Sequence, residues 1–149
     1  MNVYEAEKLV KLLFLYTDER EWDKLKDVFA ETFILDYESM NGKPPKKMTP
    51  NELVESWRGL LPGFEFTHHQ LGNIITEIKK NKAHVLCYGT ATHYIQDYEE
   101  PVWNVVGTYD LEIIEENGTL KVDKMRFNYK YATGNLSLPD IAKERLNQN

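Results

Sequence analysis

The change of hydrophobic period along the chain constrains its fold more than any other feature. Apolar residues recur at helical spacing within three early segments, residues 3–16, 22–29 and 53–61. From residue 66 onward they alternate instead, in four long runs, residues 66–78, 83–96, 102–115 and 119–132. Helices followed by a series of antiparallel strands predict an α+β fold, in which the helices cover one face of the sheet.

Capping and turn signals place the ends of several elements. Thr49 followed by Pro50 and Glu52 is a strong helix start, and Pro62-Gly63 marks the end of that helix. The pair Asn117-Gly118 is typical of a tight hairpin turn between the last two strands.

Three weaker patterns complete the expected order of elements. Alternation from Phe33 to Tyr37 predicts a short strand. Residues 39–48 contain Gly42 and two prolines, and we expect a polar loop whose lysines are solvated. Residues 138–147 are expected to form a short C-terminal helix that opens at Pro139.

Composition favours one domain over residues 1–149. The chain is 42% hydrophobic and 28% charged, so it can bury a substantial core. A net charge of −6 argues against binding to nucleic acid or to an anionic membrane, and no apolar run is long enough to span a bilayer. The single cysteine, Cys87, fits a reducing compartment, so we expect a cytoplasmic protein.

Two adjacent histidines, His68 and His69, stand near the start of the first long strand. Neighbouring residues of a strand point to opposite faces, so one of the two rings points inward. An inward His69 that lines a pocket can move a proton near neutral pH, whereas the simpler interpretation is a satisfied core histidine.

A third histidine, His93, shares one face of the next strand with small and apolar residues, including Cys87, Gly89 and Ala91. We expect this face to point inward, with its small members leaving room for a ligand beside His93. The alternative is a core histidine held by one hydrogen bond.

Asp18 has two compatible interpretations. With Glu21 it has the spacing of a capping box for the second helix. As a buried carboxylate it can instead hold a histidine in one tautomer and stabilise the imidazolium.

Aromatic side chains supply the remaining pocket candidates. The phenols that can polarise a carbonyl or position a water are those of Tyr16, Tyr37, Tyr109 and Tyr129. Trp57 and Phe127 are the further side chains expected to contact a ligand. We expect no metal site, because the rings of His68 and His69 diverge and no helix carries histidines at i,i+4 spacing.

The order of elements and several short motifs resemble the SnoaL-like branch of the nuclear transport factor 2-like (NTF2-like) superfamily, with the scytalone dehydratases as the closest match. The matching pieces are Asp18, residues 21–25, residues 35–39, Thr67-His68-His69 and Leu71-Gly72. This resemblance implies a cone in which N-terminal helices pack on a curved antiparallel or mixed sheet around a pocket. It also implies dehydration of a small cyclic alcohol without metal or organic cofactor.

Carried across by position, the resemblance assigns His69 as the catalytic histidine, Asp18 as the carboxylate that orients it, and Tyr37 as a tyrosine that holds a water against the substrate carbonyl. Other positions depart from the family. Thr17 stands where the family has a second tyrosine, Ile95 stands where it has a second pocket histidine, and a pocket asparagine falls near Tyr109. His93 lies two residues before Ile95 on the same face.

These observations predict a cofactor-free lyase or isomerase, similar to a dehydratase, that acts on a small apolar cyclic or carbonyl compound by His–Asp acid–base chemistry. The alternatives are a module of the same fold that binds a ligand or serves as an oligomeric scaffold, and a cyclase or ketosteroid isomerase with a carboxylate base. We also expect a homodimer or homotrimer, because the outward face from Leu86 to Tyr94 is apolar and aromatic.

Overall fold

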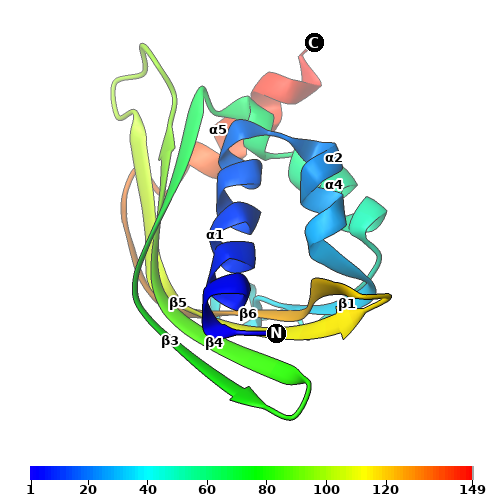
Figure 1. The fold of residues 1–149 in the computed structure, drawn as a ribbon. Coiled ribbons are helices and arrows are strands. Elements are labelled where there is room, and N and C mark those ends of the chain that lie inside the picture. The colour runs from blue at the N-terminus through cyan, green and yellow to red at the C-terminus, as the bar shows by residue number, and fades with distance from the viewer. Residues whose placement is uncertain (149) are drawn as a thin grey trace.

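The computed structural model describes residues 1–148 and shows helices first and then a long run of strands (Figure 1). The helices are α1 (Val3–Glu19), α2 (Trp22–Val28), α3 (Glu38–Asn41), α4 (Pro50–Arg58) and α5 (Leu138–Asn147), with a 3-10 turn η1 at Leu61–Gly63. The strands are β1 (Phe29–Asp36), β2 (Lys46–Met48), β3 (Phe66–Lys79), β4 (Lys82–Tyr94), β5 (Val102–Glu116) and β6 (Thr119–Gly134).

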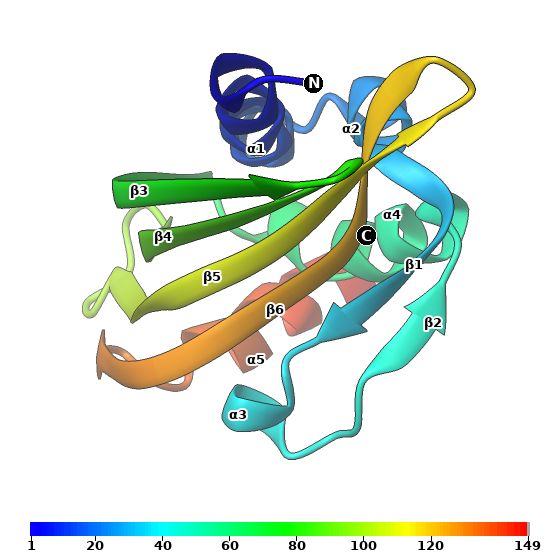
Figure 2. The same cartoon turned by 60° about the horizontal axis from the view of Figure 1, so that its bottom comes forward.

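The strands form one six-stranded mixed sheet in the order β2-β1-β6-β5-β4-β3. β1 and β6 are parallel, and the other neighbouring strands are antiparallel. The sheet is open and curves around α1, and α2 and α4 lie on the same side of it (Figures 1 and 2). α1 packs on β3 and β4, and α4 packs on β1. This arrangement is the expected α+β cone.

Helix ends follow local sequence. The Asn2 side chain accepts a hydrogen bond from the Glu5 backbone N–H, and the Glu5 carboxylate accepts one from the Asn2 backbone N–H, which completes a capping box for α1. Thr49 caps α4 as predicted, with Pro50 at the first helical position. None of the helices within residues 1–148 is long and apolar enough to cross a membrane.

Three sequence predictions in the N-terminal half are wrong. α4 ends at Arg58, before Pro62-Gly63, and residues 61–63 form the separate turn η1. α1 continues to Glu19, so Asp18 lies inside that helix and does not cap α2, whose N-cap residue Glu21 makes no side-chain capping bond. Residues 39–48 are not one loop, because α3 and β2 lie within 38–48. β2 pairs with β1 and places Met48, which is 6% exposed, opposite Phe33. A strand of three residues is too short for its sequence to reveal this pairing.

A β-bulge changes the expected alternation in β6. Tyr129 pairs with Gly107, whereas Tyr131 pairs with Val106, so Lys130 is an extra residue on β6. The sequence pattern places Tyr131 on the same face as Phe127, but the bulge pairs it with an outer-face residue and leaves it exposed. A bulge moves the residues on its far side to the opposite face of the strand, and the hydrophobic pattern does not show where this happens.

Candidate active site

An acid–base pair joins α1 to β3. The strand alternates so that His68 is exposed while His69 faces the helix, as expected for adjacent strand residues. Nδ1 of His69 lies 2.7 Å from Oδ1 of Asp18 in the last turn of α1, and both side chains are almost nine-tenths buried. A carboxylate only accepts, so Nδ1 carries the proton of a neutral ring and Nε2 keeps a free lone pair, as a general base requires.

Asp18 is held by three donors. Besides the His69 ring, the backbone N–H of His69 donates to Oδ2 at 2.7 Å and the Thr67 hydroxyl donates to Oδ1 at 3.0 Å. Three hydrogen bonds fix the orientation of the carboxylate. The structure therefore gives Asp18 the geometry of an orienting acid. Thr67 was not among the predicted site residues, although it lies two positions before His69 and so shares its face of β3.

Arg20 ties the end of α1 to the segment that leads into β3. Its guanidinium donates to the backbone oxygens of Leu61, Phe64 and Glu65 at 2.8, 2.6 and 3.3 Å. Arg20 has a φ of 57°, in the left-handed region, and it terminates α1. The helix end that carries Asp18 and the strand that carries His69 are thus connected at a second point.

His93 lies near the pair as a neutral ring. Its centroid is 6.5 Å from that of His69, and its Nδ1 lies 3.1 Å from the carbonyl oxygen of Trp103. A carbonyl only accepts, so His93 carries its proton on Nδ1 and its Nε2 is an acceptor. Burial lowers the pKa of His93 from its ordinary 6.5 to about 4, with the Trp103 carbonyl acting in the opposite direction. His93 is therefore uncharged at neutral pH.

Aromatic rings fill the inner face where we expected room for a ligand. Gly89 and Gly107 pair across β4 and β5, and a Cβ on either one would meet a ring, Tyr109 over Gly89 and Phe127 over Gly107. The Tyr109 ring also packs on Phe14, at 4.7 Å between centroids, and on Phe127, at 4.9 Å. The prediction that small residues leave space beside β4 is wrong at Gly89, because the Tyr109 ring of β5 lies over it.

Two phenols meet in this ring cluster. The Tyr37 ring lies 5.6 Å from that of Phe127, and its phenol group interacts with that of Tyr109. Burial raises the pKa of Tyr37 above the usual phenol range, and burial likewise raises the pKa of Tyr109. Both phenols therefore remain neutral. Since a phenol has one O–H, one hydroxyl of the pair keeps a proton to donate elsewhere.

The other predicted ligand-binding residues lie apart from the pair. The Tyr16 ring lies beneath the Lys24 ammonium of α2. Trp57 is half-buried on α4, and Tyr129 is 39% exposed on β6. Within residues 1–148, no ring contact joins any of the three to His69. The structure thus brings five predicted residues together, Asp18, His69, His93, Tyr109 and Phe127. Tyr37 joins this cluster through Tyr109, whereas Tyr16, Trp57 and Tyr129 lie outside it.

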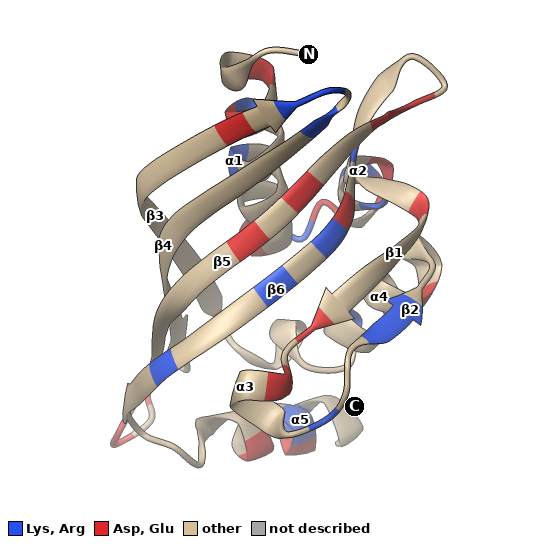
Figure 3. Ribbon diagram, turned by 90° about the horizontal axis from the view of Figure 1, so that it is seen from below, with Lys and Arg blue, Asp and Glu red and all other residues tan. Residues whose placement is uncertain are grey.

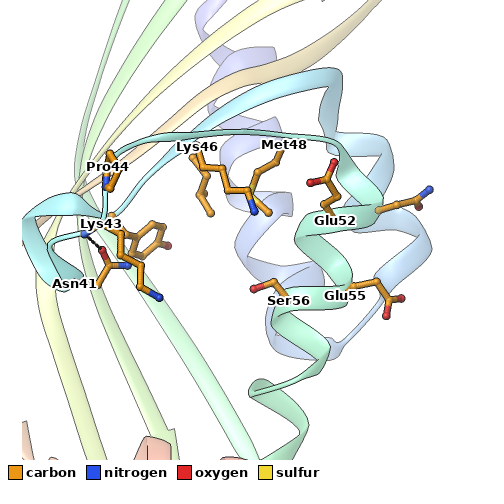
Figure 4. Close-up of a pocket in the computed structure, with 11 residues that line it drawn as sticks. Asn41, Lys43, Pro44, Lys46, Met48, Glu52, Glu55 and Ser56 are labelled. Atoms are coloured by element: carbon orange, nitrogen blue, oxygen red, sulfur yellow. Dashed lines mark hydrogen bonds between the residues drawn. The ribbon is translucent and has the colours of Figure 1, made fainter.

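A groove of about 660 Å³ opens between α4 and the segment from α3 to β2 (Figure 4). Tyr37 lines it, but His69, Asp18 and His93 do not. We expected the pocket to surround His69; the groove instead approaches the interior from the Tyr37 side, and the ring cluster separates the two.

A second His–Asp contact lies on the outer face of the sheet. His84 Nε2 is 2.7 Å from Asp110 Oδ1, and Asn128 donates to Asp110 Oδ2. Acidic residues of β5 stand beside basic residues of β6 here (Figure 3). The His84 side chain is 44% exposed, so water solvates this pair and we interpret it as part of a surface charge ladder.

The fold and the pair define the class of protein, an α+β cone of helices and curved sheet that buries an Asp–His pair. The chain belongs to the SnoaL-like domain family, whose model matches residues 3–126. Its fold is that of the NTF2-like superfamily.

Solved structures share this fold at low sequence identity. The Kfla4162 protein of Kribbella flavida superposes with a TM-score of 0.84 at 22% identity, over 92% of this chain and 95% of that one. A candidate scytalone dehydratase of Novosphingobium aromaticivorans gives 0.71 at 18%, over 89% and 86%. The hexachlorocyclohexane dehydrochlorinase LinA-type3 of Novosphingobium barchaimii gives 0.74 at 14%, over 89% of each chain. No curated protein sequence matches the chain at a significant level.

Proposed function

We propose that this protein is a cofactor-free acid–base enzyme, a dehydratase-like lyase or an isomerase, acting on a small, mostly apolar cyclic or carbonyl compound. The buried Asp18–His69 pair is the observation that carries the proposal. The similar folds of a dehydrochlorinase and a candidate scytalone dehydratase, both elimination enzymes by name, support it.

In this mechanism His69 is the catalytic base. Its Nε2 removes a proton from the carbon next to the substrate carbonyl, and Asp18 stabilises the imidazolium that forms. A neutral phenol of the Tyr37–Tyr109 pair, directly or through a water, donates to the enolate oxygen. In a dehydration, His69 then returns its proton to the departing hydroxyl, which leaves as water. In an isomerisation, it returns the proton to another carbon.

His93 contributes as an acceptor. Because its Nδ1–H is held by the Trp103 carbonyl, its free Nε2 accepts a hydrogen bond from a substrate hydroxyl. It supplies no proton at neutral pH, since its pKa lies near 4.

A carboxylate base, as in cyclase or ketosteroid-isomerase chemistry, fits this site less well. Both oxygens of Asp18 already accept hydrogen bonds, three in all. These bonds direct both oxygens at Thr67 and His69 and occupy most of their acceptor positions.

Deuterium exchange tests the proposal without knowledge of the natural substrate. Cyclic ketones such as 2-tetralone and 1-indanone are incubated with the protein in D2O, and loss of the α-proton signal is followed by NMR. We expect His69→Gln to slow the exchange by about 10²–10⁴-fold. His68→Gln is the matched control, since His68 is adjacent but faces outward. Equal rates for the wild type and His69→Gln on every ketone would contradict the proposed role.

A ligand-binding module is the second candidate, and the ring cluster favours it. Phe14 and Tyr109 pack between the groove residue Tyr37 and His69. If the protein binds the ketones tightly but exchange is no faster than in buffer, this alternative replaces the enzyme.

A further inference from the structure

Two of the three hydrogen bonds that hold Asp18 come from the residue that it orients. The His69 ring and the His69 backbone N–H both donate to the carboxylate, at 2.7 Å each. An aspartate carboxylate turns easily about its last side-chain bond, because that torsion has broad minima. With bonds from His69 alone, the carboxylate would follow the movements of the histidine. A third residue is needed to fix it independently.

Thr67 supplies the independent bond. Its hydroxyl donates to Oδ1 of Asp18 at 3.0 Å, the same oxygen that faces Nδ1 of His69. In residues 1–148 it makes the one hydrogen bond to the Asp18 side chain that does not come from His69. A carboxylate only accepts, so the Thr67 O–H points at Asp18.

The position of the Thr67 hydroxyl is itself well defined. The residue is 6% exposed, and its β-branched side chain is restricted at χ1. Thr67 pairs directly with His93 of β4, which is also buried, so the two inward side chains are cross-strand neighbours. The hydroxyl that contacts Asp18 is therefore held by the sheet and not by the catalytic histidine.

We propose that Thr67 is a positioning residue, whose hydroxyl fixes the Asp18 carboxylate independently of His69 and so aims Nε2 of His69 at the substrate. This inference rests on the proposed function, because it assigns Thr67 a part in the reaction that His69 performs. Thr67 acts through Asp18 and not on the reacting atoms. Its loss should therefore lower kcat and leave KM unchanged.

Thr67→Val tests the inference, since valine has a similar shape to threonine and lacks the hydroxyl. We expect this variant to lower kcat for the α-proton exchange of 2-tetralone by about 10–100-fold, the range typical of groups that orient a functional histidine. Thr67→Ser keeps the hydroxyl and should restore most of the rate.

Thr76→Val is the matched control. The Thr76 hydroxyl also joins β3 to a carboxylate of α1, donating to Glu7 at 3.1 Å. No hydrogen bond in the part of the chain that the structure describes links Thr76 or Glu7 to the Asp18–His69 pair. Any effect of loosening α1 on β3 would appear in this variant as well, and we expect it to keep the wild-type kcat.

Proton NMR of the His69 Nδ1–H gives a readout that needs no substrate. The signal is assigned by its absence in His69→Gln. We expect its exchange with water to be about 10-fold faster in Thr67→Val, because the loss of a hydrogen bond to a charged group makes local opening easier. Thr67→Ser and Thr76→Val should leave the exchange rate unchanged.

Two outcomes overturn the inference. One is an equal effect of Thr67→Val and Thr76→Val on kcat or on the Nδ1–H exchange, and the other is a Thr67→Ser variant as slow as Thr67→Val. Failure of the proposed function appears differently. The wild type then exchanges the ketone no faster than buffer does, while the Nδ1–H signal still distinguishes Thr67→Val from Thr76→Val.

Discussion

Replacing Asp18 with Asn tests the geometry on which the catalytic assignment depends. The Asp18 carboxylate accepts two hydrogen bonds at Oδ1 and one at Oδ2, but an amide has a single acceptor oxygen. The orientation that keeps the oxygen toward Thr67 and the His69 ring turns the NH₂ toward the His69 backbone N–H. One charge-assisted bond is lost, and the other two become neutral.

The expected cost follows from these three bonds. A hydrogen bond to a charged group contributes about 1.5–3 kcal/mol and a neutral one about 1 kcal/mol, so we expect Asp18→Asn to reduce the free energy of unfolding by at least about 2.5 kcal/mol. For a chain of 149 residues this corresponds to a fall in Tm of at least about 7 °C. Thermal unfolding followed by circular dichroism measures it.

Asp23→Asn is the control for this substitution. Its carboxylate is solvent-exposed on α2 and makes only a 4.0 Å ion pair, so its Tm should stay within about 1 °C of the wild type. In the wild type, ¹⁵N NMR should also show neutral His69 protonated on Nδ1. If Asp18→Asn and Asp23→Asn shift the Tm equally, or if His69 carries its proton on Nε2, the reasoning about this pair is refuted.

Other features of the structure give three further predictions. Because burial lowers the pKa of His93 from 6.5 to about 4, the unfolded chain binds the extra proton between these pH values. Stability should therefore fall by about 3 kcal/mol as pH drops from 6.5 to 4, and urea unfolding should show a smaller fall in His93→Leu. A Cβ at Gly89 would lie 2.2 Å from Cε2 of Tyr109, so Gly89→Ala should cost about 1–3 kcal/mol and change the near-UV circular dichroism. Gly72→Ala, where nothing lies within 4 Å, should show neither effect. We also expect the wild type to self-associate through the outer sheet face, where Tyr88 is 51% exposed, and Tyr88→Lys to shift it toward monomer in light scattering; a wild-type monomer at micromolar concentration would contradict this.

Local sequence determines much of this fold, and those parts were predictable. Thr49 and Pro50 start α4 because capping needs only neighbouring atoms, and Asn117-Gly118 forms the predicted turn, with positive φ at both residues. The opposite orientations of His68 and His69 follow from strand geometry alone.

Most of the failures involve partners distant in sequence. The Asp18 carboxylate fits a local cap, but its donors lie about fifty residues away on β3. β2 exists because β1 pairs with it, and the bulge at Lys130 is set by pairing with β5. The space over Gly89 is taken by the Tyr109 ring, which no pattern within β4 reveals. The pairing of Asp18 with His69 was predictable from the resemblance to a known family, and not from hydrophobic periodicity.

Arg20 determines how accurately the acid faces the base. It touches neither carboxylate nor imidazole, yet its three bonds to backbone oxygens anchor the terminus of α1 to the chain that enters β3. A sideways slip of that helix by one ångström would misalign the Asp18–His69 hydrogen bond, and the guanidinium resists this movement from two residues away. Natural variation at residue 20 would therefore alter the Asp18–His69 geometry, and with it the proton transfer proposed above, while both of those side chains stayed the same.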